Sequence, residues 1–157
     1  MQIVKSQILI LEVILHNQRM LNSYRRWIRQ ELIPRIGSAK EQAEILFEAP
    51  FVVVSHGVEV DPIFKYGNRK ALELFEMTWE EFTQLPSRNS AEPMHQEQRA
   101  KFMEQVTRNG FVDNYQGVRI AKTDRRFLVN NAIVWNVLDD DGKYCGQAAM
   151  FSEWEYI

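Results

Sequence analysis

The chain has 157 residues, a mass of 18.5 kDa and a formal net charge of −2, a size typical of one folding unit. Its 45% hydrophobic residues supply a core, and seven glycines, five prolines and one cysteine exclude collagen-like, low-complexity and disulfide-rich proteins. The near-balance of 19 basic and 21 acidic residues argues against a protein that mainly binds a nucleic-acid backbone, so we expect no direct nucleic-acid partner.

The charges divide the chain into two parts. Residues 1–37 contain six Lys and Arg residues and two Glu residues, a net charge of +4, whereas the remaining 120 residues carry −6. We therefore predict a basic N-terminal helical arm, 1–37, followed by an acidic domain, 38–157. Two of the arm's charges have opposite neighbours at helical spacing, which favours contact with the protein's own domain over an acidic partner or anionic lipid.

An apolar run within the arm, residues 8–15, is too short to cross a membrane. A spanning helix needs about 20 apolar residues, and Glu12 interrupts this run. No small-residue cleavage site of a secretory signal follows it. Together with a lone cysteine, Cys145, these features predict a cytoplasmic protein without a membrane span.

The first predicted elements are helices. Residues 3–33 are expected to be mostly helical, either as one bent helix or as two helices with Asn17 as the cap of the second. Ser38 and Glu41 then have the spacing of a capping box, in which each side chain accepts a hydrogen bond from the other residue's backbone N–H. A further helix is predicted over about 39–48.

Two short strands and two short helices come next. Residues 51–55 are rich in β-branched side chains, and 63–66 form a second apolar run beyond a break. A helix over 68–76 has Asn68 at its start, and a second capping box begins a short helix over about 79–84.

The last third is predicted to contain a helix over about 93–108 and then three β segments, about 111–121, 126–138 and 143–153, joined by tight turns. Strict alternation along the middle segment places six residues on one face: Phe127, Val129, Asn131, Ile133, Trp135 and Val137. Both faces of this segment are largely apolar, so neither can lie open to water. We expect the preceding helices to cover one face and the N-terminal arm, from the same chain or a partner chain, to cover the other.

The order of strand, strand, helices and three strands resembles the PAS fold. The local sequence is closer still to one family, because SHGVEVDPIFKYGN at 55–68, RKALELFEMTWEEFTQLPSR at 69–88 and SAEP at 90–93 are similar to the MEKHLA domain. The resemblance covers about residues 40–157. It implies an α+β, PAS-like fold with about five antiparallel strands, helices on one face and the helical arm in front, and a sensing or dimerising role. It implies neither a ligand nor catalytic residues.

A pocket between sheet and helices is the candidate functional site. Aromatic side chains would line it: Phe64, Tyr66, Phe75, Trp79, Tyr115 and Trp135. Polar side chains would orient a small ligand: His56, Asp61, Asn68, Arg88, Asn114 and Asn131. The alternative is that the aromatic residues simply fill the core.

Specific chemistry has little support in the sequence. His56 and Asp61 lie in one loop and would suit acid–base or metal chemistry, but a turn at Asp61-Pro62 and a histidine bonded to backbone explain them as well. Motifs for acyl, phosphoryl and dinucleotide chemistry are not found. We expect neither LOV-type flavin chemistry nor haem, since Cys145 lies in the last β segment and His95 at a polar helix start.

These observations predict a non-enzymatic PAS-like module that senses a small molecule or acts by protein association. The N-terminal helix and the outer face of the sheet would form a homodimer, or bind a protein partner. Two alternatives stay open. One is an enzyme of isomerase or hydrolase type that uses the His56/Asp61 loop, and the other is a structural dimerisation domain with a filled core.

Overall fold

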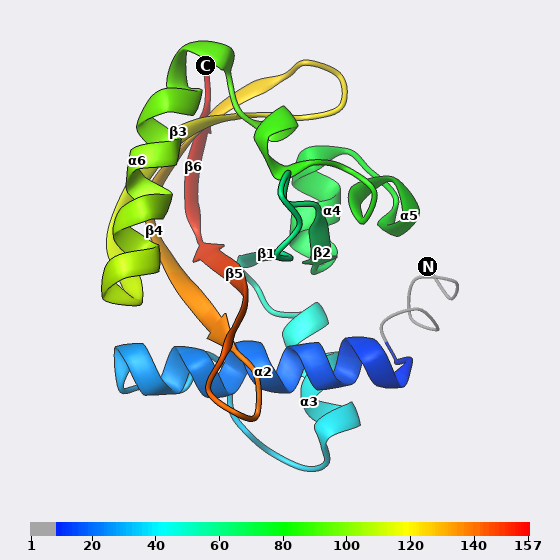
Figure 1. Ribbon diagram of the computed structural model, residues 1–157. Coiled ribbons are helices and arrows are strands. Elements are labelled where there is room, and N and C mark those ends of the chain that lie inside the picture. The colour runs from blue at the N-terminus through cyan, green and yellow to red at the C-terminus, as the bar shows by residue number, and fades with distance from the viewer. Residues whose placement is uncertain (1–8) are drawn as a thin grey trace.

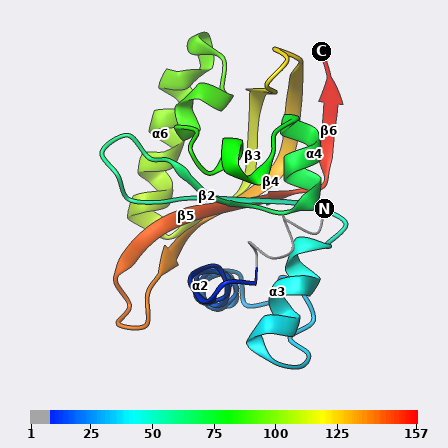
Figure 2. The ribbon, with the colours of Figure 1, turned by 90° about the vertical axis from the view of Figure 1, so that its right-hand side faces the viewer.

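The computed structural model describes residues 9–157, without the side chains of residues 93–96. A six-stranded antiparallel sheet separates two layers of helices (Figure 1 and Figure 2). The helices are α2 (Leu11–Ile28), α3 (Ala39–Phe47), α4 (Arg69–Phe75), α5 (Trp79–Phe82), the 3-10 turn η1 (Ser87–Ser90) and α6 (Pro93–Asn109). In Figure 2, α2 and α3 lie below the sheet, on its outer face, and α4 and α6 lie above it, on its inner face.

The strands run in the order β2-β1-β5-β4-β3, and β6 also pairs with β4. Their bounds are β1 (Val52–His56), β2 (Phe64–Gly67), β3 (Phe111–Ile120), β4 (Arg126–Leu138), β5 (Tyr144–Phe151) and β6 (Glu153–Tyr156). The long β4 pairs with β5 along one half and with β6 along the other. The segment predicted over 143–153 is therefore two strands that follow each other along β4. The predicted α+β sheet is confirmed, with six strands instead of about five.

The helix starts in the middle of the chain are those that the sequence predicts. Ser38 and Glu41 form a complete capping box at α3, and Thr78 and Glu81 form one at α5. Asn68 caps α4 by accepting a hydrogen bond from the backbone N–H of Ala71. Each cap pairs an N–H that the first helical turn leaves without an intrahelical partner, which fixes where the helix begins.

The N-terminal helix is shorter than predicted. It ends at Ile28, because Arg29 adopts the left-handed conformation with φ +67°. Asn17 lies inside the helix and donates to the carbonyl of Val13 at 2.7 Å, so it does not cap a second helix. The described part of the predicted 3–33 region thus contains one helix, and residues 3–8 lie outside the described residues.

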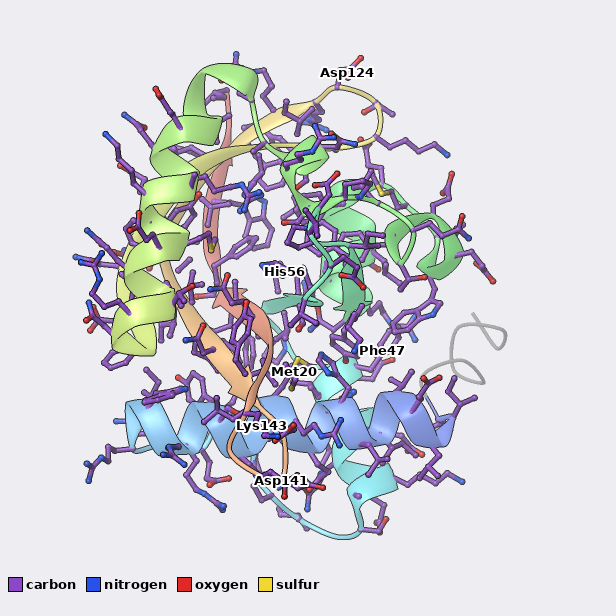
Figure 3. All side chains as sticks on the ribbon, viewed as in Figure 1. Met20, Phe47, His56, Asp124, Asp141 and Lys143 are labelled. Atoms are coloured by element: carbon purple, nitrogen blue, oxygen red, sulfur yellow. The ribbon has the colours of Figure 1, made fainter. Side chains whose placement is uncertain are left out.

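Helix α2 covers the outer face of the sheet through specific contacts. The indole N–H of Trp135 donates to the carbonyl of Met20 at 3.1 Å, and the Trp135 ring meets Tyr24 edge-on at 4.9 Å between centroids. The indole of Trp27 donates to the carbonyl of Asn136 at 2.9 Å. Figure 3 shows Met20 between α2 and the sheet. The prediction that the arm covers this apolar face is confirmed, and the covering helix belongs to the same chain.

The prediction of strict alternation along β4 is wrong, because the strand contains a bulge. Asn131 adopts φ +53°, and the register between β3 and β4 shifts at this point. Consequently Val129 and Ala132, three positions apart, both line the inner face, whereas Trp135 points to the outer face under α2. An extra residue in a strand moves every later side chain to the opposite face.

No helix within residues 9–157 has both the length and the apolar composition that crossing a membrane requires.

Candidate functional site

A small internal cavity lies between the inner face of the sheet and the helices α4 and α6. Its volume of about 40 Å³ is room for about three water molecules. Most of its lining is apolar, including Phe64, Phe75, Met103, Val129 and Phe151, and the polar lining consists of Ser55, His56, Ser87, Tyr115, Arg119 and Gln147. This combination of an apolar body with a few convergent polar groups is typical of small-molecule sites.

Aromatic packing closes the cavity beneath α4 and α5. Phe64 stacks on Phe82 with 4.2 Å between ring centroids, and Phe75 lies 5.6 Å from Phe82. Phe127 meets Phe75 edge-on at 5.4 Å. These rings fill much of the space that the sequence assigns to a pocket, which is why the remaining volume is small.

A buried chain of hydrogen bonds runs from the cavity to the C-terminal end of α6. Nε2 of His56 lies 3.2 Å from Oε1 of Gln147, and Nε2 of Gln147 donates to Oδ1 of Asn136 at 3.2 Å. The Asn136 amide donates in turn to the carbonyl of Val106 at 2.9 Å. Each group is held by the next, so the polar end of the cavity is rigid.

His56 is the titratable group at this end of the cavity. It is 8% exposed, and its Nδ1 lies 2.9 Å from the carbonyl oxygen of Gly57. Burial lowers the pKa of His56, and the nearby charges of Arg99 and Arg119 lower it further, against the two hydrogen bonds that raise it. Figure 3 shows His56 in the interior, between α6 and the α4–α5 side of the molecule.

Two arginines lie beside His56. Arg119 of β3 lines the cavity and donates to Oγ of Ser90 at 2.9 Å. Arg99 of α6 lines an adjoining surface hollow of about 270 Å³. His56, Met103 and Gln147 line both spaces, so these side chains lie between the cavity and the hollow.

Four of the twelve predicted ligand-binding residues line the cavity: His56, Phe64, Phe75 and Tyr115. Asp61 and Arg88 pair with each other at the surface, with the Arg88 Nε 3.0 and 3.1 Å from the two carboxylate oxygens. In the described part of the chain no hydrogen bond joins Asp61 to His56. The structure therefore does not bring together the acid–base pair considered from the sequence.

Four of the other predicted residues are buried away from the cavity, where they stabilise the fold: Tyr66, Asn68, Trp79 and Trp135. Asn68 is fully buried and uses its side-chain amide to join α3, β1 and α4. Tyr66 is buried against Trp79, with 5.7 Å between ring centroids, and Trp135 lies under α2 on the outer face. None of these four side chains lines the cavity.

The two remaining predicted residues lie at the surface. Asn114 is exposed on β3, and Asn131 is exposed at the β4 bulge, where it donates to Glu153. The bulge explains why the Asn131 side chain is exposed, because a left-handed residue in a strand turns its side chain out of the alternating pattern.

Gln147, Asn136, Arg119 and Arg99 are the site residues that the sequence interpretation missed. One signal was available for the first two. Asn136 and Gln147 are direct partners in the β4–β5 ladder, and counting back from the predicted Asp-Gly turn would have paired them. The two arginines come from separate elements, and no spacing in the chain connects them.

The described residues offer no cluster of side chains for a metal ion. Within the described residues no group of three or more His, Cys, Asp or Glu side chains is placed to hold a metal ion. Cys145 is a half-buried free thiol on β5, and burial raises its pKa. The side chain of His95, considered from the sequence as a haem ligand, lies outside the described residues.

Comparison with solved structures identifies the fold. A PAS domain from Colwellia psychrerythraea has a TM-score of 0.62 at 13% identity, over 75% of this chain and 95% of that one. A light-oxygen-voltage domain studied with a flavin analogue has a TM-score of 0.58 at 13% identity, over 74% and 84%. An RNA-binding light-oxygen-voltage receptor has a TM-score of 0.62 at 13% identity, over 75% of this chain and 34% of the receptor.

The sequence comparisons differ in outcome. A search of curated proteins finds no match. The sequence model of the MEKHLA domain matches residues 14–156, a range that includes most of α2 together with the whole sheet.

Proposed function

Because the chain belongs to the MEKHLA domain family and has a PAS-like fold, we propose that it is a non-enzymatic sensory module that binds a small ligand on the inner face of its sheet. The observation that carries the proposal is the cavity itself. Its apolar body ends in His56, Gln147 and Arg119, three polar side chains that converge from three strands. Such a site orients a ligand without supplying a nucleophile and base at reacting distance.

Met103 gives the ligand a way in. Its side chain lines both the internal cavity and the surface hollow. An unbranched methionine changes rotamer at little cost and adapts to different shapes. Movement of Met103 would merge the two spaces, so a ligand larger than the cavity would be accommodated.

The sheet offers a short route from the ligand to the N-terminal helix. The side chain of Gln147 faces the cavity, and its backbone carbonyl accepts a hydrogen bond from Ser55 Oγ at 2.8 Å. The same Ser55 oxygen lies 2.9 Å from Nε2 of His16 on α2. A ligand that shifts Gln147 would therefore disturb the packing of α2 on the outer face.

Filling the cavity tests the proposal. Ala132 is 1% exposed and lines the cavity, so Ala132→Leu occupies the space that a ligand needs. Ala39→Leu, at the start of α3 on the other side of the sheet, is the matched control. We expect native mass spectrometry or a thermal-shift screen of small molecules to detect ligands that bind the unaltered protein and Ala39→Leu but not Ala132→Leu. Equal responses of all three proteins, or no ligand for any of them, would overturn the proposal.

Dimerisation is a second candidate function, supported by an apolar row on the solvent side of the N-terminal helix. Ile10, Leu11 and Leu15 are 50%, 71% and 44% exposed. Since the sheet-facing side of α2 already packs in its own chain, this row is an apolar surface of the described part of the arm that a second copy could cover. The mass of the Leu11→Ser/Leu15→Ser variant in light scattering should fall from that of a dimer to that of a monomer, with unchanged circular dichroism. A monomeric unaltered protein would exclude this candidate.

A further inference from the structure

Two partly buried arginines converge on His56, and neither forms an ion pair with a described carboxylate. Arg99 comes from α6 and Arg119 from β3, and both lie close enough to His56 to act on its charge. Nε of Arg99 is buried and has no hydrogen-bond partner among the described residues. Among the described residues, the Arg119 side chain donates to the neutral hydroxyl of Ser90. Two cations held together in a partly dry site repel each other unless an anion lies between them.

The carboxylates around this site are already engaged. Asp61 is held by Arg88, whose Nε lies 3.0 Å from one of its oxygens. Glu104, on the rim of the hollow, pairs with Arg108 at 3.2 Å. Glu92 pairs with Arg126. Among the side chains that the structure describes, neither Arg99 nor Arg119 forms an ion pair, and the charge of Asp61, which is shared with Arg88, offsets only part of the positive charge at the mouth of the cavity.

The hydrogen-bond acceptors around His56 favour a positively charged ring at this site. The Asn136 amide must point its NH₂ at the Val106 carbonyl, so its oxygen accepts from Gln147. Gln147 therefore presents its own oxygen to Nε2 of His56, while a carbonyl oxygen faces Nδ1. Only the doubly protonated imidazolium donates to both oxygens.

The unliganded site is thus unbalanced. Burial and the two arginines lower the pKa of His56 and favour neutral imidazole, which leaves one of the two facing oxygens without a donor. Burial and the charge of Arg119 likewise lower the pKa of Arg99 to about 10, although Tyr115 and Asp61 act in the opposite direction. One negative charge placed between the three side chains would relieve both the repulsion and the missing hydrogen bond.

We propose that the ligand of this protein is a small organic carboxylate, whose carboxyl group binds Arg99 and Arg119 beside His56 and whose apolar end enters the cavity lined by Phe64, Phe75 and Phe151. This inference rests on the proposed sensing function and names its ligand class. Guanidinium groups bind carboxylates by paired hydrogen bonds. The apolar lining and the volume of about 40 Å³ favour a short hydrocarbon end over a second charged group.

Matched acids and amides test the charge requirement. Benzoate and hexanoate are compared with benzamide and hexanamide, and with inorganic phosphate, by calorimetry and thermal shift on the full chain. We expect each acid to bind at least tenfold more tightly than its amide, because a charge-assisted pair is lost. Arg99→Gln and Arg119→Gln should each weaken acid binding about tenfold or more. Lys101→Gln, which removes an exposed cation from the same helix, should leave acid binding unchanged.

The ring of His56 supplies a readout that does not depend on the arginine variants. In NMR titrations of the unaltered protein, saturating benzoate or hexanoate should raise the pKa of His56, whereas the amides should leave it unchanged.

The outcomes separate this inference from the sensing function. If acids and amides bind equally well and the arginine variants bind as the unaltered protein does, the carboxylate assignment is wrong while ligand binding stands. Binding of phosphate without binding of the acids would also overturn it, as would acid binding that leaves the His56 titration unmoved. If none of the compounds binds in either charge state, the carboxylate assignment fails, and failure of the cavity-filling screen as well would overturn the sensing function.

Discussion

Protonation of His16 should destabilise the folded protein in mild acid. His16 lies on α2, is 6% exposed, and contacts Ser55 Oγ at 2.9 Å on the outer face of the sheet. Burial lowers its pKa to about 3, with smaller contributions from the charges of Lys65 and Arg19. The folded protein therefore holds neutral histidine at this position down to strongly acidic pH.

The magnitude follows from the difference between the folded and unfolded states. An unfolded histidine has a pKa of about 6.5, so the folded value is the lower one. The contribution of neutral His16 is then fully present above about pH 6.5 and is lost as the pH falls from there toward about 3. At pH 5 the solution is about 1.5 pH units below the unfolded pKa. Each unit corresponds to about 1.36 kcal/mol, so the loss of stability is about 2 kcal/mol.

Urea unfolding at pH 7.5 and pH 5 measures this loss. The control is His16→Gln, whose amide keeps a polar partner for Ser55 but does not titrate. We expect the free energy of unfolding to fall by about 2 kcal/mol more for the unaltered protein than for the variant, or its melting temperature by about 4–8 °C more. Histidines elsewhere titrate equally in both proteins, so they cancel. Equal falls would refute the conclusion that buried His16 stays neutral.

Four substitutions at three positions test the packing around the site by urea unfolding. Asn68→Ala should cost about 3 kcal/mol or more, because buried N–H and C=O groups of α3, β1 and α4 lose their partners; a cost below about 1 kcal/mol would show that water replaces them. Asn131→Gly should change stability by less than about 0.5 kcal/mol and Asn131→Val should cost about 1–2 kcal/mol, since φ is +53°; equal effects would contradict the bulge. Gly146→Ala should cost about 3 kcal/mol, because φ is +155° and the new Cβ would lie 2.4 Å from the His56 carbonyl oxygen; an unchanged midpoint would contradict this close approach.

Local hydrogen bonding explains why the helix starts could be predicted. Ser38 with Glu41, and Thr78 with Glu81, satisfy backbone groups within four residues of each other. Such pairs need no information from the rest of the chain. The end of α2 at Ile28 had no comparable signal, because Arg29 takes a left-handed conformation that glycine usually provides. The first helix-breaking residues that follow in the sequence are Pro34 and Gly37.

Which side chains face the pocket depends on the register of β4, and the sequence did not predict the shift in that register. Alternation along β4 is correct on each side of Asn131 but changes face there, so Trp135 was assigned to the cavity and Ala132 to the opposite face. Asparagine tolerates φ above zero better than most residues. However, an Asn130-Asn131 pair inside an apolar strand does not by itself show which residue, if either, bulges.

The same bulge explains how one strand serves two different surfaces. Before it, Phe127 and Val129 face the helices of the inner layer; after it, Ala132 and Val134 do so, and Trp135 is freed for α2. Without the shift, the bulky indole would occupy the cavity, and Ala132 and Val134 would lie under α2. The small side chain of Ala132 is what leaves room on the inner face, so the cavity and the anchoring of the N-terminal helix have a common structural origin in Asn131.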